Sequence, residues 1–554
     1  MNLNSTANYN KWLYLFIGLA VLINFSGICT TILGPDATLY ASIAKTMVHR
    51  NNYVELFAYG TDWLDKPHFP FWVTALSFKL FGINTWAYKL PAICFLLMGA
   101  WYTYLFAKAL YNEQVALWSV LILLTAQHII LSNNDVRAEP YLTGLIIASV
   151  YHFYKSYTPT INWWHLLAGC VFTACAIMTK GMFALIPIGG AVVGHFIITK
   201  QWNQLFNWRW LLTAILILIF ILPEIYCLYQ QFDRHPEKIL FDQRGISGIK
   251  FFFWDSQFGR FFNTGPIKGH GDPSFFIHTT LWAFLPWSLI LFAGIYQFIK
   301  KGSKTVQATE WYCICGSLLT FLLFSASKFQ LPHYLNIVFP FFAIISAWYL
   351  SQIKNVKYIR ILQLAVIVLM VAAISVLQYF FIPATFSDLS RLLMAIFFFA
   401  LLFLPQRLTA DPIQRIIFQT LLASFVVNVY LNQVFYPNLS HYQAGSEAAI
   451  WLNHHNAKKI PVAQADDYYS TAMEFYSEEP VINLKPDGTG KTPTGPFVLY
   501  ASSSTITNLK AQGWDIKPIK TFNRYWVSRL KPAFLNQATR KDELSTTELV
   551  LVNR

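Results

Sequence analysis

Six ionisable side chains stand at the ends of apolar segments, where a charge is costly and usually marks a substrate pathway or a relay. The chain is only 12% charged, which makes their placement informative. The six are Asp36, Lys66, Glu139, Lys180, Arg260 and Lys328. A carboxylate beside several cations suits the transfer of a group from an anionic lipid. The cations bind the anionic headgroup and neutralise the phosphate that departs. The carboxylate activates a hydroxyl or an amine by accepting its proton. The pattern predicts group transfer at a membrane surface.

Other chemistries lack their sequence patterns. His, Cys and Asp residues do not cluster with metal-ligand spacing, and GxGxxG, Walker A and GxSxG motifs are absent. The stretch GTGK at 488–491 resembles part of a phosphate-binding loop, but it lacks the required spacing and a following apolar helix. We interpret it as a turn. The sequence thus identifies no metal site and no cofactor, and it does not imply a divalent cation.

The composition indicates a protein with many membrane spans. Of the 554 residues, 55% are apolar and 17% are aromatic, whereas soluble domains are about 45–50% apolar and about 25% charged. The net charge of +14 fits Lys and Arg in cytoplasmic loops and beside anionic membrane lipids, and we expect no nucleic-acid binding. All seven cysteines lie in apolar segments, so the sequence offers neither a disulfide framework nor a CxxC metal site.

A membrane-spanning helix needs about 20 mostly apolar residues, and we count thirteen candidates. They are residues 12–33, 85–110, 114–133, 138–156, 163–180, 182–199, 208–230, 275–299, 308–327, 333–351, 359–381, 388–405 and 414–435. The first has no small-residue cleavage site, so we interpret it as an uncleaved helix. Lys and Arg in the short loops satisfy the positive-inside rule if the N-terminus is cytoplasmic. Residues 34–84, 231–274 and everything after about 436 would then face outside.

The first and second external segments are expected to hold helices at the membrane interface. Helical spacing of apolar residues predicts an amphipathic helix over 37–50. Its apolar face would carry Tyr40, Ile43, Ala44 and Met47, and its opposite face Ser42, Lys45, Thr46 and His49. The apolar stretch 69–81 is short for a span and fits a second interfacial or half-inserted helix. The aromatic and basic loop 231–274 predicts a third, and together these would roof an outward-facing cavity.

From about residue 436 the composition becomes that of a soluble domain. Apolar runs predict strands at 460–463, 480–484, 496–501 and 525–530, and helix-like stretches lie at 443–455, 467–477 and 503–513. We therefore expect a transmembrane catalytic domain over 1–435 and a small α/β domain over 436–554. The predicted fold class is a polytopic α-helical membrane protein with external interfacial helices and a C-terminal α/β soluble domain.

Five stretches in the membrane region follow the order and the predicted side of the motifs of a known family. They are PDATLYASIAKTMV at 35–48, LDKPHFPFW at 64–72, MTKG at 178–181, FWDSQFGRF at 253–261 and SASKFQLPHYLNIVFP at 325–340. Together they resemble the polyprenyl-phosphate-dependent membrane glycosyltransferases of the GT-C superfamily. The particular similarity is to the group that contains the lipid A aminoarabinose transferase and the protein O-mannosyltransferases.

The resemblance implies roles for the residues at matching positions. Asp36 would be the catalytic carboxylate, and Asp65 fills the acidic position before Lys66. Lys66, Arg260 and Tyr334 would contact the phosphate of the lipid-linked donor. The implied activity is inverting transfer of a sugar from a polyprenyl (undecaprenyl) phosphate donor to a lipid A-like or protein acceptor. It would take place at the outer, periplasmic face of the bacterial cytoplasmic (inner) membrane.

Two positions depart from the pattern of the family. In SNNDVRAEPYLTG, Glu139 stands where the family more often has Asp, and Asp135 lies four residues earlier. Either acid would serve as the second site carboxylate, and Glu139 fits a structural hydrogen bond equally well. His333 in LPHY stands where the aminoarabinose transferases usually have Thr, which allows a different recognition of the donor headgroup. Lys180 and Lys328 would support the site.

The other site residues also have structural interpretations. Asp36 would make a good N-cap for the helix that follows it. Lys66 would extend to lipid headgroups, and Arg260 would pair locally with Asp255. Tyr334 would belong to the aromatic belt at the membrane interface.

Two other classes of function stay open. A lipid flippase or transporter places charges near the bilayer midplane and shows internal repeats or broken helices, whereas these charges gather at helix ends and no repeat relates the two halves. A membrane scaffold for envelope synthesis explains the C-terminal domain but gives the external charges no purpose.

Overall fold

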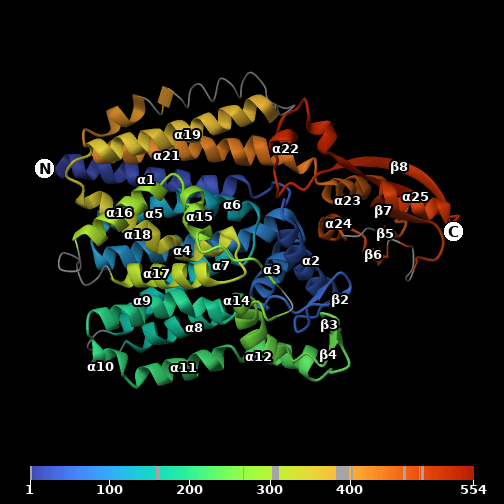
Figure 1. The fold of residues 1–554 in the computed structure, drawn as a ribbon, viewed down its shortest axis with the longest axis horizontal. Helices are drawn as coiled ribbons and strands as arrows, with labels where there is room; N and C mark the ends of the chain where they lie inside the picture. Colours follow the sequence, from blue (N-terminus) through green and yellow to red (C-terminus); the bar gives the residue numbers. More distant parts are fainter. Residues whose placement is uncertain are drawn as a thin grey trace.

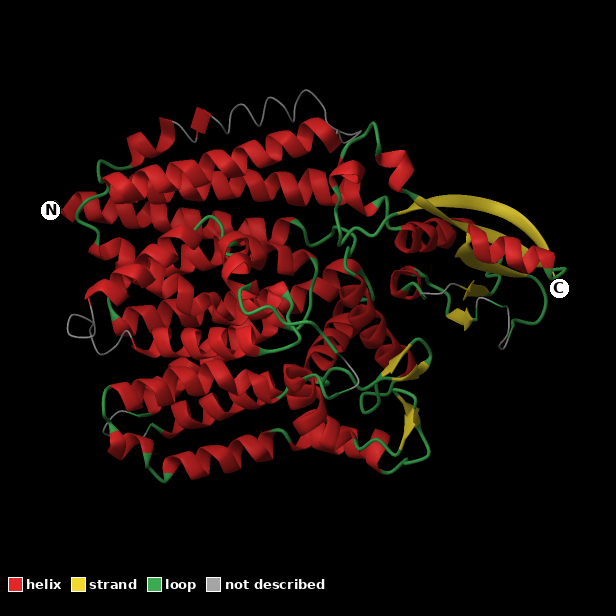
Figure 2. Cartoon of the chain, viewed as in Figure 1, coloured by secondary structure: helices red, strands yellow, loops and turns green. Residues whose placement is uncertain are grey.

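The computed structural model describes residues 3–157, 162–265, 268–301, 311–381, 399–400, 403–465, 469–485, 487 and 492–553. Long helices lying side by side form the body of the molecule (Figure 1). At one end of this body lie α2 (Pro35–Arg50), two short hairpins and a five-stranded sheet (Figure 2). The N-terminus lies at the opposite end. The segments that the sequence places outside the membrane are therefore gathered on one side of the helical body.

The helices of the body follow the predicted apolar segments. They are α1 (Leu3–Ser26), α4 (Thr85–Leu110), α5 (Glu113–Thr125), α6 (Gln127–Asn134), α7 (Glu139–Ser156), α8 (Trp163–Lys180), α9 (Leu185–Ile198), α10 (Trp202–Leu205), α11 (Arg209–Phe220), α12 (Leu222–Leu228), α15 (Phe275–Ala283), α16 (Ser288–Lys301), α17 (Trp311–Ala326), α18 (Phe339–Gln352), α19 (Lys357–Phe381) and α21 (Pro412–Tyr430). Twelve of the predicted spans fall on these helices. The segment 388–405 lies mostly outside the described residues.

Length and hydropathy identify fewer spans than the sequence pattern predicts. In the described part of the chain, five helices are long and apolar enough to cross a membrane, or six if α5 and α6, bent by 50° relative to each other, form one span. The five are Thr85–Leu110, Trp202–Phe220, Pro332–Gln352, Lys357–Phe381 and Pro412–Ser440. Several predicted spans are divided between shorter helices, as 275–299 is between α15 and α16. The total of thirteen stays a prediction.

Close packing of α4 and α7 fixes the end of α7 that reaches the candidate site. A methyl group on Gly99 of α4 would lie 3.0 Å from the Gly144 Cα of α7, so both positions need glycine for the helices to approach. Small residues at helix contacts are typical of packing in membranes. Pro140 in the first turn of α7 gives up an N–H that would have no partner within the helix. The packing thus sets the position of Glu139, the first residue of α7.

The helix α2 matches the segment predicted at 37–50, but part of its polar face is covered by α24 (Thr471–Tyr476). Thr38 Oγ1 lies 2.6 Å from Thr471 Oγ1. The Lys45 ammonium donates to the carbonyl oxygens of Glu474 and Phe475 at 2.9 and 3.1 Å. These carbonyls belong to the last turn of α24, where a cation compensates acceptors that have no partner within the helix. Two polar residues of α2, Thr38 and Lys45, therefore contact another part of the protein, whereas His49 near the end of the helix is exposed.

The first and second external segments are joined to each other. The Leu56 N–H donates to Gln231 Oε1 at 2.9 Å, and Gln231 Nε2 donates to the Leu56 carbonyl at 2.8 Å. Lys238 Nζ lies 2.8 Å from Asp62 Oδ1. The elements of these segments are β1 (Phe57–Ala58), β2 (Thr61–Asp62), α3 (Phe69–Phe81), β3 (Ile239–Leu240), β4 (Gln243–Arg244), α13 (Gly248–Lys250), a wide helical run over Phe251–Gly259 and α14 (Arg260–Phe262). They lie toward one end of the helical body (Figure 1), and we call this part of the molecule the roof.

The C-terminal part holds a mixed sheet with the strand order β6-β5-β7-β9-β8. β5 is parallel to β6 and β7, whereas β9 is antiparallel to β7 and β8. The elements are α22 (Tyr436–Ser440), α23 (Ala444–His455), β5 (Val462–Ala465), α24, β6 (Val481–Leu484), β7 (Phe497–Ser502), α25 (Ser503–Ala511), β8 (Asp515–Arg524), α26 (Pro532–Leu535) and β9 (Ser545–Asn553). Three predicted strands and three predicted helices correspond to elements of this region. The domain boundary at 436 stays a prediction, and GTGK at 488–491 lies outside the described residues.

The strand predicted at 525–530 was wrong. β8 ends at Arg524, and Tyr525 leaves the sheet to stack on Phe534 with ring centroids 3.6 Å apart. β8 is an outer strand of the sheet and pairs with β9 alone, so it tolerates Pro518, Lys517 and Lys520. Because β8 is mostly polar, the apolar pattern does not predict it and indicates the neighbouring run 525–530 instead.

Candidate active site

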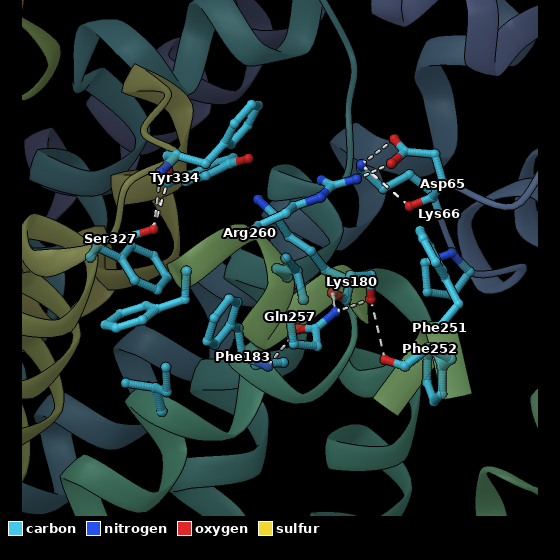
Figure 3. A pocket seen from close by; sticks show the side chains of 18 of the residues that line it. Asp65, Lys66, Lys180, Phe183, Phe251, Phe252, Gln257, Arg260, Ser327 and Tyr334 are labelled. Atoms are coloured by element: carbon cyan, nitrogen blue, oxygen red, sulfur yellow. Dashed lines mark hydrogen bonds and ion pairs between the residues drawn. The ribbon is translucent and has the colours of Figure 1, made fainter. Parts of the chain in front are cut away.

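A cavity opens beneath the roof, between the first external segment, the second external segment and the ends of α8 and α17 (Figure 3). Its wall is largely apolar, and it includes phenylalanines from the loop after α8, the helical run 251–259 and α17. Its charged and polar side chains include Asp65, Lys66, Lys180, Arg260 and Tyr334. The structure thus brings together five site residues that are scattered over 270 positions of sequence.

Asp65 holds two cations at one side of this cavity. Lys66 Nζ lies 2.6 Å from Asp65 Oδ2, and the Arg260 guanidinium pairs with the other carboxylate oxygen. Arg260 also lies over the Phe329 ring, 5.6 Å from its centroid. Arg260 pairs with Asp65 and not with Asp255, so the predicted local pair was wrong. One carboxylate between two cations leaves a positive charge, which suits an anionic group in the cavity.

A second contact within the cavity joins Lys180 and Tyr334. The Lys180 ammonium lies 3.7 Å from the centroid of the Tyr334 ring, a cation–π contact, and it pairs with Glu139. Both Lys180 and Tyr334 line the cavity, whereas Glu139 is 2% exposed and does not. Glu139 is therefore placed as the counter-ion of Lys180. Tyr334 faces the cavity and not the outer surface, whereas a residue of the aromatic belt would face the membrane interface.

Asp36 lies apart from the cavity, in the first turn of α2. Its side chain is 49% exposed, and its Oδ2 lies 3.0 Å from Arg137 Nη1. The N-cap of α2 is Gly34, and no side chain caps this end, so the predicted capping role of Asp36 was wrong. Asp36 instead stands within the first turn, where the partial positive charge of the helix end favours a carboxylate. Its exposure leaves it accessible to a second substrate.

Arg137 connects Asp36 to the cavity, and the sequence analysis missed it. Its Nη2 lies 3.0 Å from Asp135 Oδ2, and its Nη1 lies 3.3 Å from His333 Nδ1. His333 Nε2 in turn lies 3.8 Å from Glu139 Oε1. A continuous line of contacts therefore runs from Asp36 through Arg137, His333 and Glu139 to Lys180. The available signal in the sequence is that Arg137 lies midway between Asp135 and Glu139, the two candidates for the second site carboxylate.

The charge of Arg137 is secured by its surroundings. Burial lowers the pKa of its guanidinium, but the carboxylates of Asp135, Asp36 and Glu139 together raise that pKa above its ordinary value. Asp135 approaches the backbone at Gly34, where a methyl group would collide with its carboxylate. Asp135 is thus held by Arg137 and by the turn that precedes α2.

A fully buried pair lies behind the turn that carries Asp65 and Lys66. The His68 N–H donates to Glu224 Oε2 at 3.0 Å, and His68 Nδ1 lies 3.0 Å from Glu224 Oε1. His68 Nε2 lies 2.9 Å from the Val54 carbonyl oxygen. Both ring nitrogens therefore face oxygens, which ties the turn to α12 and to the preceding loop. Sequence reasoning missed Glu224, although a lone acid inside the apolar run 208–230 was a visible signal.

Lys328 does not join the site. Its side chain is exposed and does not line the cavity, while its N–H donates to the Phe261 carbonyl at 3.2 Å. Ser327 and Phe329 on either side of it line the cavity instead. Within the described residues, no group of three or more His, Cys, Asp or Glu side chains is arranged to hold a metal ion.

Sequence comparisons agree with the resemblance carried by the motifs. Residues 65–227 match the family described as dolichyl-phosphate-mannose-protein mannosyltransferase. The chain is 24% identical over 394 residues to an uncharacterized protein of Aquifex aeolicus, covering 70% of this chain and 74% of that protein. It is 28% identical over 338 residues to the undecaprenyl phosphate-alpha-4-amino-4-deoxy-L-arabinose arabinosyl transferase of Edwardsiella ictaluri, covering 59% of this chain and 57% of that enzyme. The chain thus spans about half the length of the arabinosyl transferases it matches.

The fold matches that of a solved structure. The structure superposes on ArnT from Cupriavidus metallidurans bound to undecaprenyl phosphate with a TM-score of 0.74, at 18% identity and 98% coverage of both chains. The chain therefore has the fold of that protein. Its similarity is to the aminoarabinose transferases named above.

Proposed function

We propose that the protein is an inverting glycosyltransferase that moves a sugar from a polyprenyl (undecaprenyl) phosphate to a lipid A-like or protein acceptor. The observation that carries this proposal is the line of contacts from the exposed Asp36 to the cationic cavity. A carboxylate for the acceptor and cations for the phosphate are thus held in one framework. The names of the similar arabinosyl transferases and of the ArnT structure support the same donor class.

The donor phosphate would bind in the cavity, beside Lys66 and Arg260. The bond between the anomeric carbon and the phosphate oxygen breaks in the reaction, and negative charge builds on the departing phosphate. Lys66 and Arg260 stabilise that charge because Asp65 compensates only part of theirs. Tyr334 donates a hydrogen bond to the phosphate, and Lys180 fixes its ring.

Asp36 would act as the catalytic base. The acceptor hydroxyl or amine attacks the anomeric carbon from the face opposite the phosphate, which inverts the configuration, and Asp36 accepts its proton. Asp36 suits this role better than Glu139 because its carboxylate is half exposed, whereas Glu139 is buried against Lys180. Arg137 orients the Asp36 carboxylate, and Asp135 holds Arg137 from the other side.

The roof would exclude water, which otherwise competes as acceptor. The contacts of Gln231 with Leu56 and of Lys238 with Asp62 hold its two halves together. The polyprenyl tail would leave the cavity between helices. We propose that the roof and the C-terminal sheet face the periplasm and that the N-terminus is cytoplasmic, which agrees with their positions at opposite ends of the helical body.

The proposal is tested with the purified protein in proteoliposomes that contain a labelled polyprenyl-phosphate sugar. Glycosyl transfer predicts release of free polyprenyl phosphate that depends on added acceptor. A flippase would move the intact donor across the bilayer and release none, and a scaffold would do neither. Acceptor-independent movement of intact donor would therefore replace this proposal by the transporter alternative.

A further inference from the structure

A second cavity lies between the first turn of α2 and the C-terminal sheet. One wall comes from α2, where Pro35 and Thr38 flank Asp36 in the sequence. The other walls come from the N-terminal end of α24 and from the segment where β8 ends. We call it the sheet–α2 cavity. None of its lining residues lines the donor cavity, so a molecule bound here would not compete for the phosphate site.

The lining of the sheet–α2 cavity is aromatic, hydroxylated and cationic. Its side chains include Tyr59, Tyr469, Ser470, Thr471, Arg524 and Trp526. Trp526 is 59% exposed, and the rings of Tyr59 and Tyr469 lie 6.3 Å apart. Aromatic faces pack on the C–H faces of sugar rings, hydroxyls exchange hydrogen bonds with sugar hydroxyls, and Arg pairs with phosphate. The described lining residues include no carboxylate, which would repel a phosphate.

Tyr59 links this cavity to the catalytic end of α2. Its backbone has φ of 55°, a conformation that is uncommon for a bulky residue and that clusters at functional sites. Burial and the nearby carboxylates of Glu474 and Asp36 raise the pKa of the Tyr59 hydroxyl to about 12. The hydroxyl therefore keeps its proton at neutral pH and can donate to a ligand beside the first turn of α2.

We propose that the sheet–α2 cavity binds the phosphorylated saccharide headgroup of a glycolipid acceptor. Trp526 and Tyr59 pack on its sugar rings, Arg524 faces a phosphate, and the reacting group is presented toward Asp36. This inference rests on the proposed function and narrows it, because it selects a glycolipid over a protein acceptor. The C-terminal sheet would then recognise the acceptor while the membrane helices hold the donor.

Acceptor binding without donor tests the inference separately from catalysis. The probes are lipid A, dephosphorylated lipid A and a Ser/Thr-rich peptide, added to the full chain in nanodiscs. The variant Trp526→Ala should weaken lipid A binding at least about tenfold, or about 1.4 kcal/mol, and leave polyprenyl phosphate binding unchanged. Trp164→Ala is the matched control, because Trp164 is 69% exposed and lies about 24 Å along α8 from Lys180. It should alter neither affinity.

Arg524→Gln tests the phosphate contact. Removing the phosphates of lipid A should weaken its binding to the unaltered protein but change little for this variant. Unchanged lipid A affinity in a folded Trp526→Ala protein overturns the inference, and so does loss of peptide binding with lipid A binding intact. Acceptor bound in this cavity without any release of polyprenyl phosphate would instead contradict the proposed function alone.

Discussion

Arg137 Nη1 lies 3.0 Å from Asp36 Oδ2, so the candidate base is held by a cation that comes from a loop a hundred residues away in sequence. The same guanidinium reaches Asp135 through its other terminal nitrogen. A planar fork can bridge two carboxylates in a fixed geometry, which the point charge of a lysine cannot. Arg137 therefore sets the direction of the Asp36 carboxylate, and its replacement should affect catalysis more than donor binding.

Arg137→Lys should lower kcat at least about tenfold, or about 1.4 kcal/mol, with little change in the affinity for the polyprenyl-phosphate donor. The measurement is steady-state transfer beside donor binding in the same preparation. Arg234→Lys is the control, because Arg234 is exposed and bonds only locally to Gln230. An equal loss of donor affinity in Arg137→Lys would assign Arg137 to the phosphate site instead.

Lys66→Ala and Arg260→Ala should each weaken binding of polyprenyl phosphate. Each variant leaves Asp65 to compensate the remaining cation fully, so the net positive charge beside Asp65 is lost. Hydrogen bonds to charged groups contribute about 1.5–3 kcal/mol, so we expect a loss in affinity of at least about tenfold. Lys250→Ala removes an exposed lysine of the second external segment, which also carries Arg260, and this variant should bind polyprenyl phosphate normally. Normal binding by both cavity variants would place the phosphate elsewhere.

Glu224→Ala should lower the thermal stability of the protein and weaken donor binding together. The change leaves the buried His68 backbone N–H without its acceptor, and an unsatisfied buried donor costs about 1–3 kcal/mol. The turn that carries Asp65 and Lys66 loses its attachment to α12 at the same time. The measurement is the Tm in detergent with and without polyprenyl phosphate. Glu237→Ala, at an exposed acid of the second external segment, should behave like the unaltered protein.

Lys45 makes the contact between α2 and α24 depend on pH. Burial lowers the pKa of its ammonium to about 8, whereas an unfolded lysine titrates at about 10.4. Between these two pKa values the unfolded chain binds more protons than the folded protein, so the free energy of unfolding rises with pH. The stabilisation that comes from the lowered pKa of Lys45 is complete above the unfolded pKa and is lost as pH falls through about 8. The Tm of the protein should therefore rise relative to that of Lys45→Met between pH 8 and 10. A constant difference over this range would contradict the assignment.

Lys66, Lys180 and Arg260 of the cavity could be identified from the sequence because each is a charged group at the end of an apolar segment, whereas Asp65 and Tyr334 were reached through the motif resemblance. Lys66, Lys180 and Arg260 could be chosen one at a time, without knowledge of their partners. Their pairing could not be predicted, since Arg260 reaches Asp65 across 195 residues and not its neighbour Asp255.

Long-range contacts also explain what the sequence left out. Arg137 acquires its role only when α2 is folded beside the loop before α7, and Glu224 only when α12 packs behind His68. The polar face of α2 resembled that of an interfacial helix because its cover, α24, lies more than 400 residues further along the chain. Periodicity reports that a face is polar and not what covers it.

The central claim is that Asp36 accepts the proton of the acceptor while the cationic cavity holds the donor. Its most direct measurement is single-turnover release of polyprenyl phosphate by Asp36→Asn in proteoliposomes, with Asp255→Asn as the matched control. The account predicts a rate lowered by at least about a hundredfold with donor affinity unchanged, and a normal rate for the control. Near-normal turnover in Asp36→Asn would contradict it.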